Sequence, residues 1–211
     1  MAITLDESGL RFVFDGDAVK FDETAYYRNY AKNQPEGKGV DFIALSQSGI
    51  QMIEVKNCRG HEFENRWRIG PNNSSRQKRL PGQDETDRDS VDIEVAKKIA
   101  SSLACLYGAW TKAPRSNSTE ELAKLWVNIT DPRLPTDQKQ LQVILFLEGN
   151  FGCQTRPKTA IMKRLQESIQ KKLSWLNCKV SVIDSDWCHR YKIGFAVTDT
   201  EYEYKTFFTG N

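Results

Sequence analysis

Asp41, Glu54 and Lys56 have the residue types and the spacing that a divalent-metal site requires. They lie at the outer ends of two short apolar runs, residues 40–45 and 50–56. The runs are separated by a turn-forming segment rich in serine and glycine, so we expect a β-hairpin. In that hairpin Asp41 lies directly opposite Glu54, with Cβ atoms about 4.5–5.5 Å apart, and strand alternation places Lys56 on the face of Glu54. The pattern therefore predicts two carboxylates and one ammonium on one face of a sheet.

Two carboxylates at this separation repel each other unless a cation or a proton lies between them. Both runs are apolar on both faces, which is typical of strands in the interior of a covered sheet. Charged side chains at the end of such a strand are costly unless they are paired or bound to metal. The alternative is a solvated strand face that carries Glu54 and Lys56, with Asp41 ending a turn.

These residues resemble the PD-(D/E)XK nuclease family, whose signature is an acid on one core strand and an acid-x-Lys triplet on the next. Val40-Asp41 corresponds to the first element and Glu54-Val55-Lys56 to the second. Val40 stands where the family name has proline. The resemblance implies an α/β fold with a restriction-endonuclease-like mixed central sheet flanked by helices. It covers residues 39–57, and the rest of the chain agrees only in the order of its elements.

The resemblance also implies a chemistry, the metal-dependent hydrolysis of phosphodiester bonds, with DNA as the expected substrate. Asp41 and Glu54 would bind Mg²⁺, with Mn²⁺ able to substitute, because Mg²⁺ prefers oxygen ligands. The main-chain carbonyl of Val55 would be a further ligand, and Lys56 would orient or deprotonate the attacking water and stabilise the transition state. An upstream acid often completes such a site, and Glu23 is the best placed candidate here. Asp22 is the alternative, and either acid can equally be a helix cap or a surface residue.

Residues 57–90 form a long polar stretch without periodicity, which indicates a functional loop, an insertion or a mobile segment. Its first part is basic and contains Trp67, a combination that suits phosphate contact and base stacking. The candidate nucleic-acid-binding residues are Arg66, Arg68, Arg76, Lys78 and Arg79. The other interpretation is a solvated loop whose charges keep it soluble.

The remaining chain predicts alternating strands and helices in one nuclease-like domain spanning residues 1–211. We expect a hairpin from residues 10–14 and 18–21 around Asp15-Gly16, and a short helix from Glu23 to Lys32 capped by Asp22. Helical periodicity covers residues 91–110, 121–130 and 158–176, and strand patterns cover residues 140–149, 179–186 and 192–199.

Composition places few limits on the partners of this protein. The net charge is +2 over 211 residues, so only local charge can argue for nucleic acid. No apolar run is long enough for a membrane span, and five scattered cysteines favour a reducing cytoplasm. Zinc at Cys58 with His61, or at Cys188 with His189, lacks a second ligand pair.

Two other function classes remain open beside an independent nuclease. The first is a nuclease fold that binds nucleic acid or a protein without cutting. The second is a subunit of a repair, transposition or defence complex that cuts only with its partner. A homodimer is expected if both strands of a duplex are cut, because that usually requires two active sites.

Overall fold

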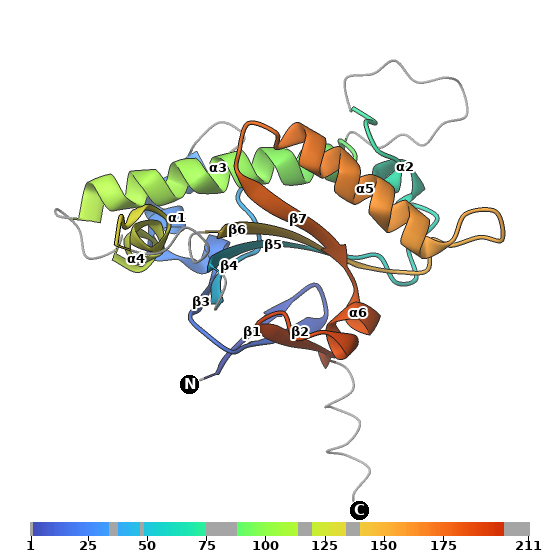
Figure 1. The fold of residues 1–211 in the computed structure, drawn as a ribbon, viewed down its shortest axis with the longest axis horizontal. Coiled ribbons are helices and arrows are strands. Elements are labelled where there is room, and N and C mark those ends of the chain that lie inside the picture. The colour runs from blue at the N-terminus through green and yellow to red at the C-terminus, as the bar shows by residue number, and fades with distance from the viewer. Residues whose placement is uncertain are drawn as a thin grey trace, which may run out of the picture.

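The chain folds into a mixed α/β structure with two β-sheets and several helices (Figure 1). The structure is a computed structural model, and it describes residues 2–33, 38–46, 49–74, 88–113, 120–133 and 140–200. The larger sheet has the strand order β3-β4-β5-β6-β7. These strands are β3 (Ala18–Lys20), β4 (Phe42–Ser46), β5 (Gly49–Asn57), β6 (Gln140–Glu148) and β7 (Cys178–Ile183).

This larger sheet is mixed, since β3, β4 and β5 are antiparallel neighbours whereas β5, β6 and β7 run parallel. The smaller sheet is antiparallel, with the order β1-β2-β8. Its strands are β1 (Ile3–Glu7), β2 (Leu10–Phe14) and β8 (Phe195–Asp199). The mixed character of the larger sheet agrees with the expectation from the sequence.

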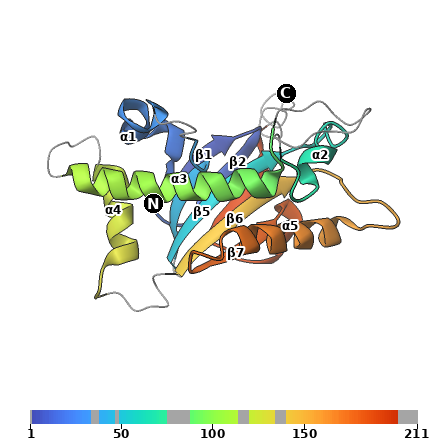
Figure 2. The same cartoon turned by 90° about the horizontal axis from the view of Figure 1, so that it is seen from above.

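The helices lie mainly on one face of the larger sheet, and the smaller sheet covers the other face (Figure 1). Figure 2 shows α3 and α5 crossing the strands, with α4 near one end of α3. The helices are α1 (Ala25–Asn29), α2 (Arg66–Ile69), α3 (Val91–Lys112), α4 (Glu120–Thr130), α5 (Lys158–Lys172) and α6 (Ser185–Arg190), with 3₁₀ turns at Phe21–Glu23 and Ala31–Asn33.

Two apolar cores hold these layers together. The helix-side core joins Ile43 and Met52 of the larger sheet to residues such as Val95 and Ile99 of α3. The inter-sheet core contains Phe12, Phe14, Phe42, Phe146 and Phe195. Because side chains alternate along a strand, β4 and β5 contribute to both cores, as their two-sided apolar pattern predicted.

The register of the β4–β5 hairpin is the one predicted from the sequence. Leu45 pairs with Ile50, and Phe42 pairs with Ile53. One step further out, Asp41 therefore comes opposite Glu54. Strands β6 and β7 and helices α3, α4 and α5 also lie where periodicity placed them, within a few residues at their ends.

The predicted hairpin of residues 10–14 and 18–21 is wrong, because β2 and β3 belong to different sheets. Strand β2 instead forms a hairpin with β1. Ser8 and Gly9 in the tight turn between them both have positive φ, 52° and 78°. The segment around Gly16 connects β2 of the smaller sheet to β3 of the larger sheet. A Cβ on Gly16 would lie 2.7 Å from the carbonyl oxygen of Leu45 in β4. Glycine there serves a close backbone approach between sheets.

The predicted short helix needs correction in its length and in its cap. Helix α1 is shorter than predicted and is capped by Thr24, whose Oγ1 accepts a hydrogen bond from the backbone N–H of Tyr27 at 3.2 Å. Asp22 belongs to the preceding 3₁₀ turn and does not cap α1. The long polar stretch at 57–90 contains α2, and its residues 75–87 lie outside the described residues.

The stability of the inter-sheet core is testable at Phe12, which is fully buried and packs against four other phenylalanine rings at centroid distances of 5.0–6.3 Å. We expect Phe12→Ala to lower the free energy of unfolding by about 3–5 kcal/mol. The same substitution at Phe63, which is 69% exposed, should cost no more than about 0.5 kcal/mol. Urea unfolding of both variants measures the difference, and similar costs would contradict the assigned core.

Candidate active site

Asp41, Glu54 and Lys56 lie together on the helix-covered face of the larger sheet. Their neighbours on the same strand faces, Ile43 and Met52, belong to the helix-side core. Glu54 and Lys56 are near the carboxyl end of β5, and Asp41 immediately precedes β4, which runs antiparallel to β5. The site therefore lies at one edge of the sheet, where parallel strands β5 and β6 end and where α/β proteins commonly bind ligands.

Lys56 contacts Glu54 directly, and the backbone of Val55 holds Asp41 beside them. The Lys56 Nζ is 2.7 Å from Glu54 Oε1, and the backbone N–H of Val55 donates to Asp41 Oδ2 at 2.7 Å. The side chain of Glu54 is fully buried, whereas those of Asp41 and Lys56 are 19% and 16% exposed. The sequence prediction that these residues share one face and one small volume is confirmed by these distances.

Helix α3 contributes two further charged residues, Glu94 and Lys98, one helical turn apart. The Lys98 Nζ lies 2.6 Å from Glu54 Oε1 and 3.5 Å from Asp41 Oδ1, so this ammonium bridges both carboxylates. Glu94 Oε1 is 3.1 Å from the Lys56 Nζ. Because residues four apart lie on the same helix face, one helix delivers both charges to the sheet.

Helix α2 completes this set of charges with Arg68. Its Nη2 is 2.5 Å from Glu94 Oε2, and the residue is only 8% exposed. The result is an alternating sequence of opposite charges from Asp41 through Lys98, Glu54, Lys56 and Glu94 to Arg68. We call these six residues the charge cluster.

Neither Glu94 nor Lys98 was among the site residues predicted from the sequence. A signal was present, since Glu94 and Lys98 each precede a core residue of the apolar stripe, Val95 and Ile99. That position flanks the buried face of a helix. The rotation of α3 over the sheet decides whether such flanking residues reach the strands, and a single sequence does not specify it.

Burial and neighbouring charges have opposite effects on the pKa at four groups of the charge cluster. Burial raises the pKa of Asp41 and Glu54 above their ordinary values despite the nearby ammonium groups. At Lys56, burial alone would lower the pKa, but the carboxylates of Glu54 and Glu94 outweigh it and raise the pKa. Glu94 is stabilised as a carboxylate by Lys56 and Arg68, which overcome burial and lower its pKa to about 2. Lys56 is therefore protonated at neutral pH.

One carboxylate oxygen in the charge cluster has no hydrogen-bond partner in the described part of the protein. Among the described residues, Glu54 Oε2 is buried without a hydrogen-bond partner. Three other buried carboxylates, Asp92, Glu148 and Asp184, have both oxygens bonded to side chains or backbone N–H groups. A buried, unpartnered carboxylate oxygen is costly, so Glu54 is the exception that needs an explanation.

The acids present fit a magnesium site with two protein carboxylates. No group of three or more His, Cys, Asp or Glu side chains is arranged to hold a metal in the described part of the chain. Magnesium is nevertheless commonly bound by one or two carboxylates, with waters and substrate phosphate filling its other positions. Asp41 and Glu54 meet that requirement, and Lys98 lies where it neutralises both.

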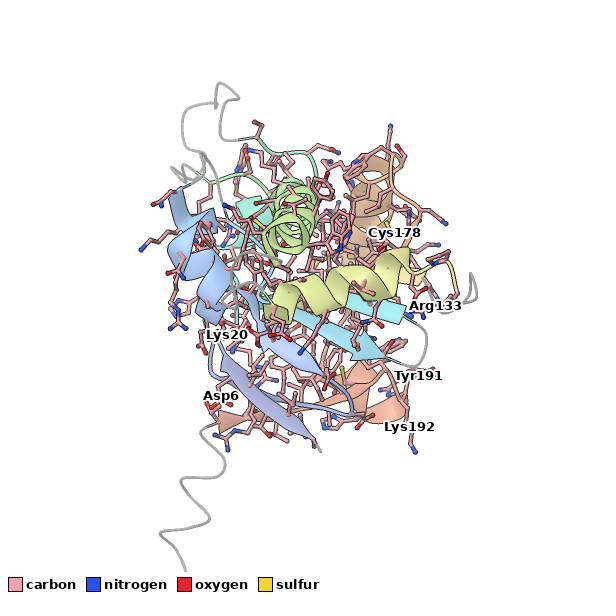
Figure 3. All side chains as sticks on the ribbon, turned by 90° about the vertical axis from the view of Figure 1, so that its left-hand side faces the viewer. Asp6, Lys20, Arg133, Cys178, Tyr191 and Lys192 are labelled. Atoms are coloured by element: carbon pink, nitrogen blue, oxygen red, sulfur yellow. The ribbon has the colours of Figure 1, made fainter. Side chains whose placement is uncertain are left out.

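Glu23, the candidate third ligand, lies on the 3₁₀ turn before α1 and forms an ion pair with Lys20 at 3.3 Å. Its side chain is 66% exposed. Figure 3 shows Lys20 on the same side of the molecule as Asp6 of β1, and the Lys20 Nζ also pairs with Glu7 at 3.1 Å. The structure thus places Glu23 in a surface ion pair at the edge of the two sheets.

The predicted nucleic-acid-binding residues separate into different environments. Arg68 points inward to Glu94, so its charge is neutralised within the protein. Arg66 is exposed and lines a cavity of about 900 Å³ beyond the ends of β5 and β6. Arg76, Lys78 and Arg79 lie outside the described residues.

Comparison with known proteins assigns the chain to a family but not to an activity. The family described as "Family of unknown function (DUF6661)" matches residues 24–197, and the chain belongs to it. Neither the curated proteins nor the solved structures contain a match. Among the helices of the described residues, none combines the length and the apolar character that a membrane span requires.

The lowered pKa of Glu94 predicts how the stability of the fold depends on pH. Because the pKa of Glu94 is depressed from 4.5 to about 2, its ion pairs stabilise the fold above pH 4.5, and this contribution disappears as the pH falls toward 2. Glu94→Gln should therefore cost about 3 kcal/mol of unfolding free energy at pH 7 and progressively less below pH 4.5. Urea unfolding of both proteins between pH 3 and pH 7 measures this. A difference that stays constant over that range would contradict the assigned ion pairs.

Proposed function

We propose that this protein is a metal-dependent nuclease of the restriction-endonuclease-like type, which hydrolyses phosphodiester bonds in DNA. The observation that carries the proposal is the convergence of Asp41, Glu54 and Lys56 at the edge of the sheet, with Glu54 Oε2 buried and unpartnered. An acid-x-Lys triplet such as Glu54-Val55-Lys56 can occur by chance. A chance triplet would not be expected to have a second acid, Asp41, 13 positions earlier in the sequence and beside it in the fold.

The arrangement of strands supports the same proposal. The PD-(D/E)XK signature requires its two motifs on adjacent core strands, and here Asp41 borders β4 while Glu54 and Lys56 lie on the neighbouring β5. The sheet is mixed, and helices cover the face that bears the site. Fold alone does not define function, and it is the charged residues and their geometry that distinguish a nuclease site here.

Asp41 and Glu54 would hold the Mg²⁺ ion, with the main-chain carbonyl of Val55 as a further ligand by resemblance to the family. When bound, the ion would polarise the phosphate and lower the pKa of a coordinated water. The chain itself contributes the orientation of these carboxylates. The N–H of Val55 fixes Asp41 Oδ2, which leaves Asp41 Oδ1 directed toward Lys98.

Lys56 would act as a cation rather than as a base. Its raised pKa keeps the ammonium protonated at neutral pH, so it can donate hydrogen bonds to a water or to a phosphate oxygen. The carboxylate of Glu94 fixes its position from the other side at 3.1 Å. A positioned ammonium that faces the phosphate stabilises the negative charge that develops there during hydrolysis.

A second function is favoured by one observation, the neutralisation of both carboxylates by Lys56 and Lys98. If these ammonium groups permanently occupy the position of a metal ion, the protein would be a nuclease fold that binds nucleic acid without cutting it. A partner that rearranges Lys98 would instead make cutting dependent on a complex. Metal-dependent cleavage by the isolated chain distinguishes the proposed function from both alternatives.

The proposal is tested by cleavage of supercoiled plasmid and of labelled single strands in Mg²⁺ or Mn²⁺. We expect Asp41→Asn, Glu54→Gln and Lys56→Ala each to lower the rate by at least about 100-fold, because each removes a group that touches the metal or the reacting phosphate. Lys97→Ala is the matched control, since Lys97 is on α3 but its side chain is 53% exposed and pairs with Asp89. Wild-type inactivity, or equal rates in all variants, would contradict the proposal for the isolated chain.

Lys98 has a distinct expected behaviour, because a bound cation would have to displace its ammonium from between the carboxylates. Lys98→Met removes the competing charge while it keeps an apolar side chain of similar length. Mg²⁺ affinity measured by titration calorimetry should therefore rise by about tenfold or more, since the repulsion between like charges in a buried site exceeds 1.4 kcal/mol. An unchanged or weaker affinity in a folded Lys98→Met protein would show that the ion binds elsewhere.

A further inference from the structure

A cavity of about 900 Å³ lies outside the charge cluster, at the same edge of the larger sheet. One wall comes from the segment that follows β5, another from the segment that follows β6, and a third from the start of α5. The backbone N–H of Asn150 donates to Glu62 Oε1 at 3.0 Å and joins the first two walls. Because β5 and β6 are parallel, both segments leave the sheet beside Glu54 and Lys56.

The lining of this cavity is basic. Arg66, Arg156 and Arg164 are exposed, and none of these guanidinium groups pairs with a carboxylate in the described part of the chain. Glu62 is the acid in the lining, and it is engaged by the Asn150 N–H. Three unneutralised arginines around one hollow form a site for anions, and their planar donors match phosphate oxygens.

Two aromatic rings accompany these arginines. Phe63 is 69% exposed, and the Arg66 guanidinium lies 5.3 Å from the centre of its ring. Phe151 lines another part of the cavity, and its ring lies against Gly149, where an added Cβ would come within 2.6 Å of the ring. Gly149 also has a φ of +131°, so both the backbone conformation and the nearby Phe151 ring favour glycine at this position. Phe151 is partly buried and packs against the helix-side core, whereas the exposed Phe63 belongs to neither apolar core.

We propose that this cavity binds single-stranded nucleic acid, with an unstacked base against Phe63 and Phe151 and with backbone phosphates at Arg66, Arg156 and Arg164. Aromatic faces stack on bases only when those bases are not already stacked in a duplex. A hollow of this volume suits a nucleotide, whereas a duplex would present only its backbone to the arginines. The charge and the aromatic rings together therefore select a single strand.

This inference deepens the proposed function, because the strand would continue from the cavity to the nuclease site. Helix α2 joins the two regions, since Arg66 faces the cavity while Arg68, two residues on, binds Glu94 of the charge cluster. The substrate class would then be a single strand, or a single-stranded end or gap next to a duplex. DNA and RNA share the chemistry that the cavity recognises, so the test includes both.

Binding is measured separately from cleavage, by fluorescence anisotropy of labelled single-stranded DNA, single-stranded RNA and duplex DNA with the full chain in EDTA. The wild type should bind at least one kind of single strand about tenfold or more tightly than duplex. Phe63→Ala should weaken this binding by about 5- to 100-fold, the effect of losing one base–aromatic stack. Arg156→Glu should weaken it and reduce the steepness of its salt dependence, because fewer counterions are released.

Two matched variants control for exposure and charge. Trp175→Ala removes an aromatic side chain that is 62% exposed but does not line the cavity, and Arg28→Glu reverses an exposed arginine on α1. Both should bind as the wild type does. Preference for duplex, absence of binding to both single strands, or equal binding by Phe63→Ala, Arg156→Glu and the controls would overturn the inference.

The outcomes separate this inference from the proposed nuclease activity. Cavity-dependent binding in EDTA without cleavage in Mg²⁺ would retain the single-strand site and reject the nuclease. The opposite outcome is cleavage that is lost in Glu54→Gln, with binding that is unchanged in Phe63→Ala and Arg156→Glu. It would support the nuclease and reject the cavity as its substrate site.

Discussion

The burial of the Glu54 carboxylate is the constraint on which the arrangement of this protein depends. Removing a charge from water costs several kcal/mol even after the protein relaxes around it. Two ammonium groups, from Lys56 on the same strand and Lys98 on α3, compensate for that cost at 2.7 and 2.6 Å. Glu94 and Arg68 then extend the alternation of charge to α2. Ion pairs therefore link this one buried carboxylate to helices α3 and α2, which come from separate parts of the sequence.

Stability alone does not account for such a cluster, because apolar residues of similar volume often replace buried ion pairs without loss of stability. The surrounding layers are already held by two large apolar cores, one beneath the helices and one between the sheets. The charges instead lie near the carboxyl ends of β5 and β6, beside a basic cavity. This location and the unpartnered Glu54 Oε2 fit the proposed function, in which an external cation would replace the ammonium of Lys98 between the carboxylates.

The residues on β4 and β5 were predictable because strand geometry is local. A two-residue period and a short turn determine that Asp41 faces Glu54, and the observed pairing of Leu45 with Ile50 follows the same count. Glu94, Lys98 and Arg68 were not predictable in this way, because their approach depends on how α3 and α2 dock on the sheet. The Asp15-Gly16 signal failed for a related reason, since turn chemistry does not specify which strand a segment pairs with.

The central claim, that Asp41 and Glu54 hold a divalent metal, is tested most directly by crystals grown with Mn²⁺ and measured for anomalous scattering. We expect an anomalous peak between the two carboxylates, within coordination distance of Glu54 Oε2, with the Lys98 ammonium moved away from Asp41. The crystals should contain Mn²⁺ at a concentration that saturates known nuclease sites. The metal site would be ruled out if no anomalous peak lies at these carboxylates and both lysines keep their contacts with Glu54.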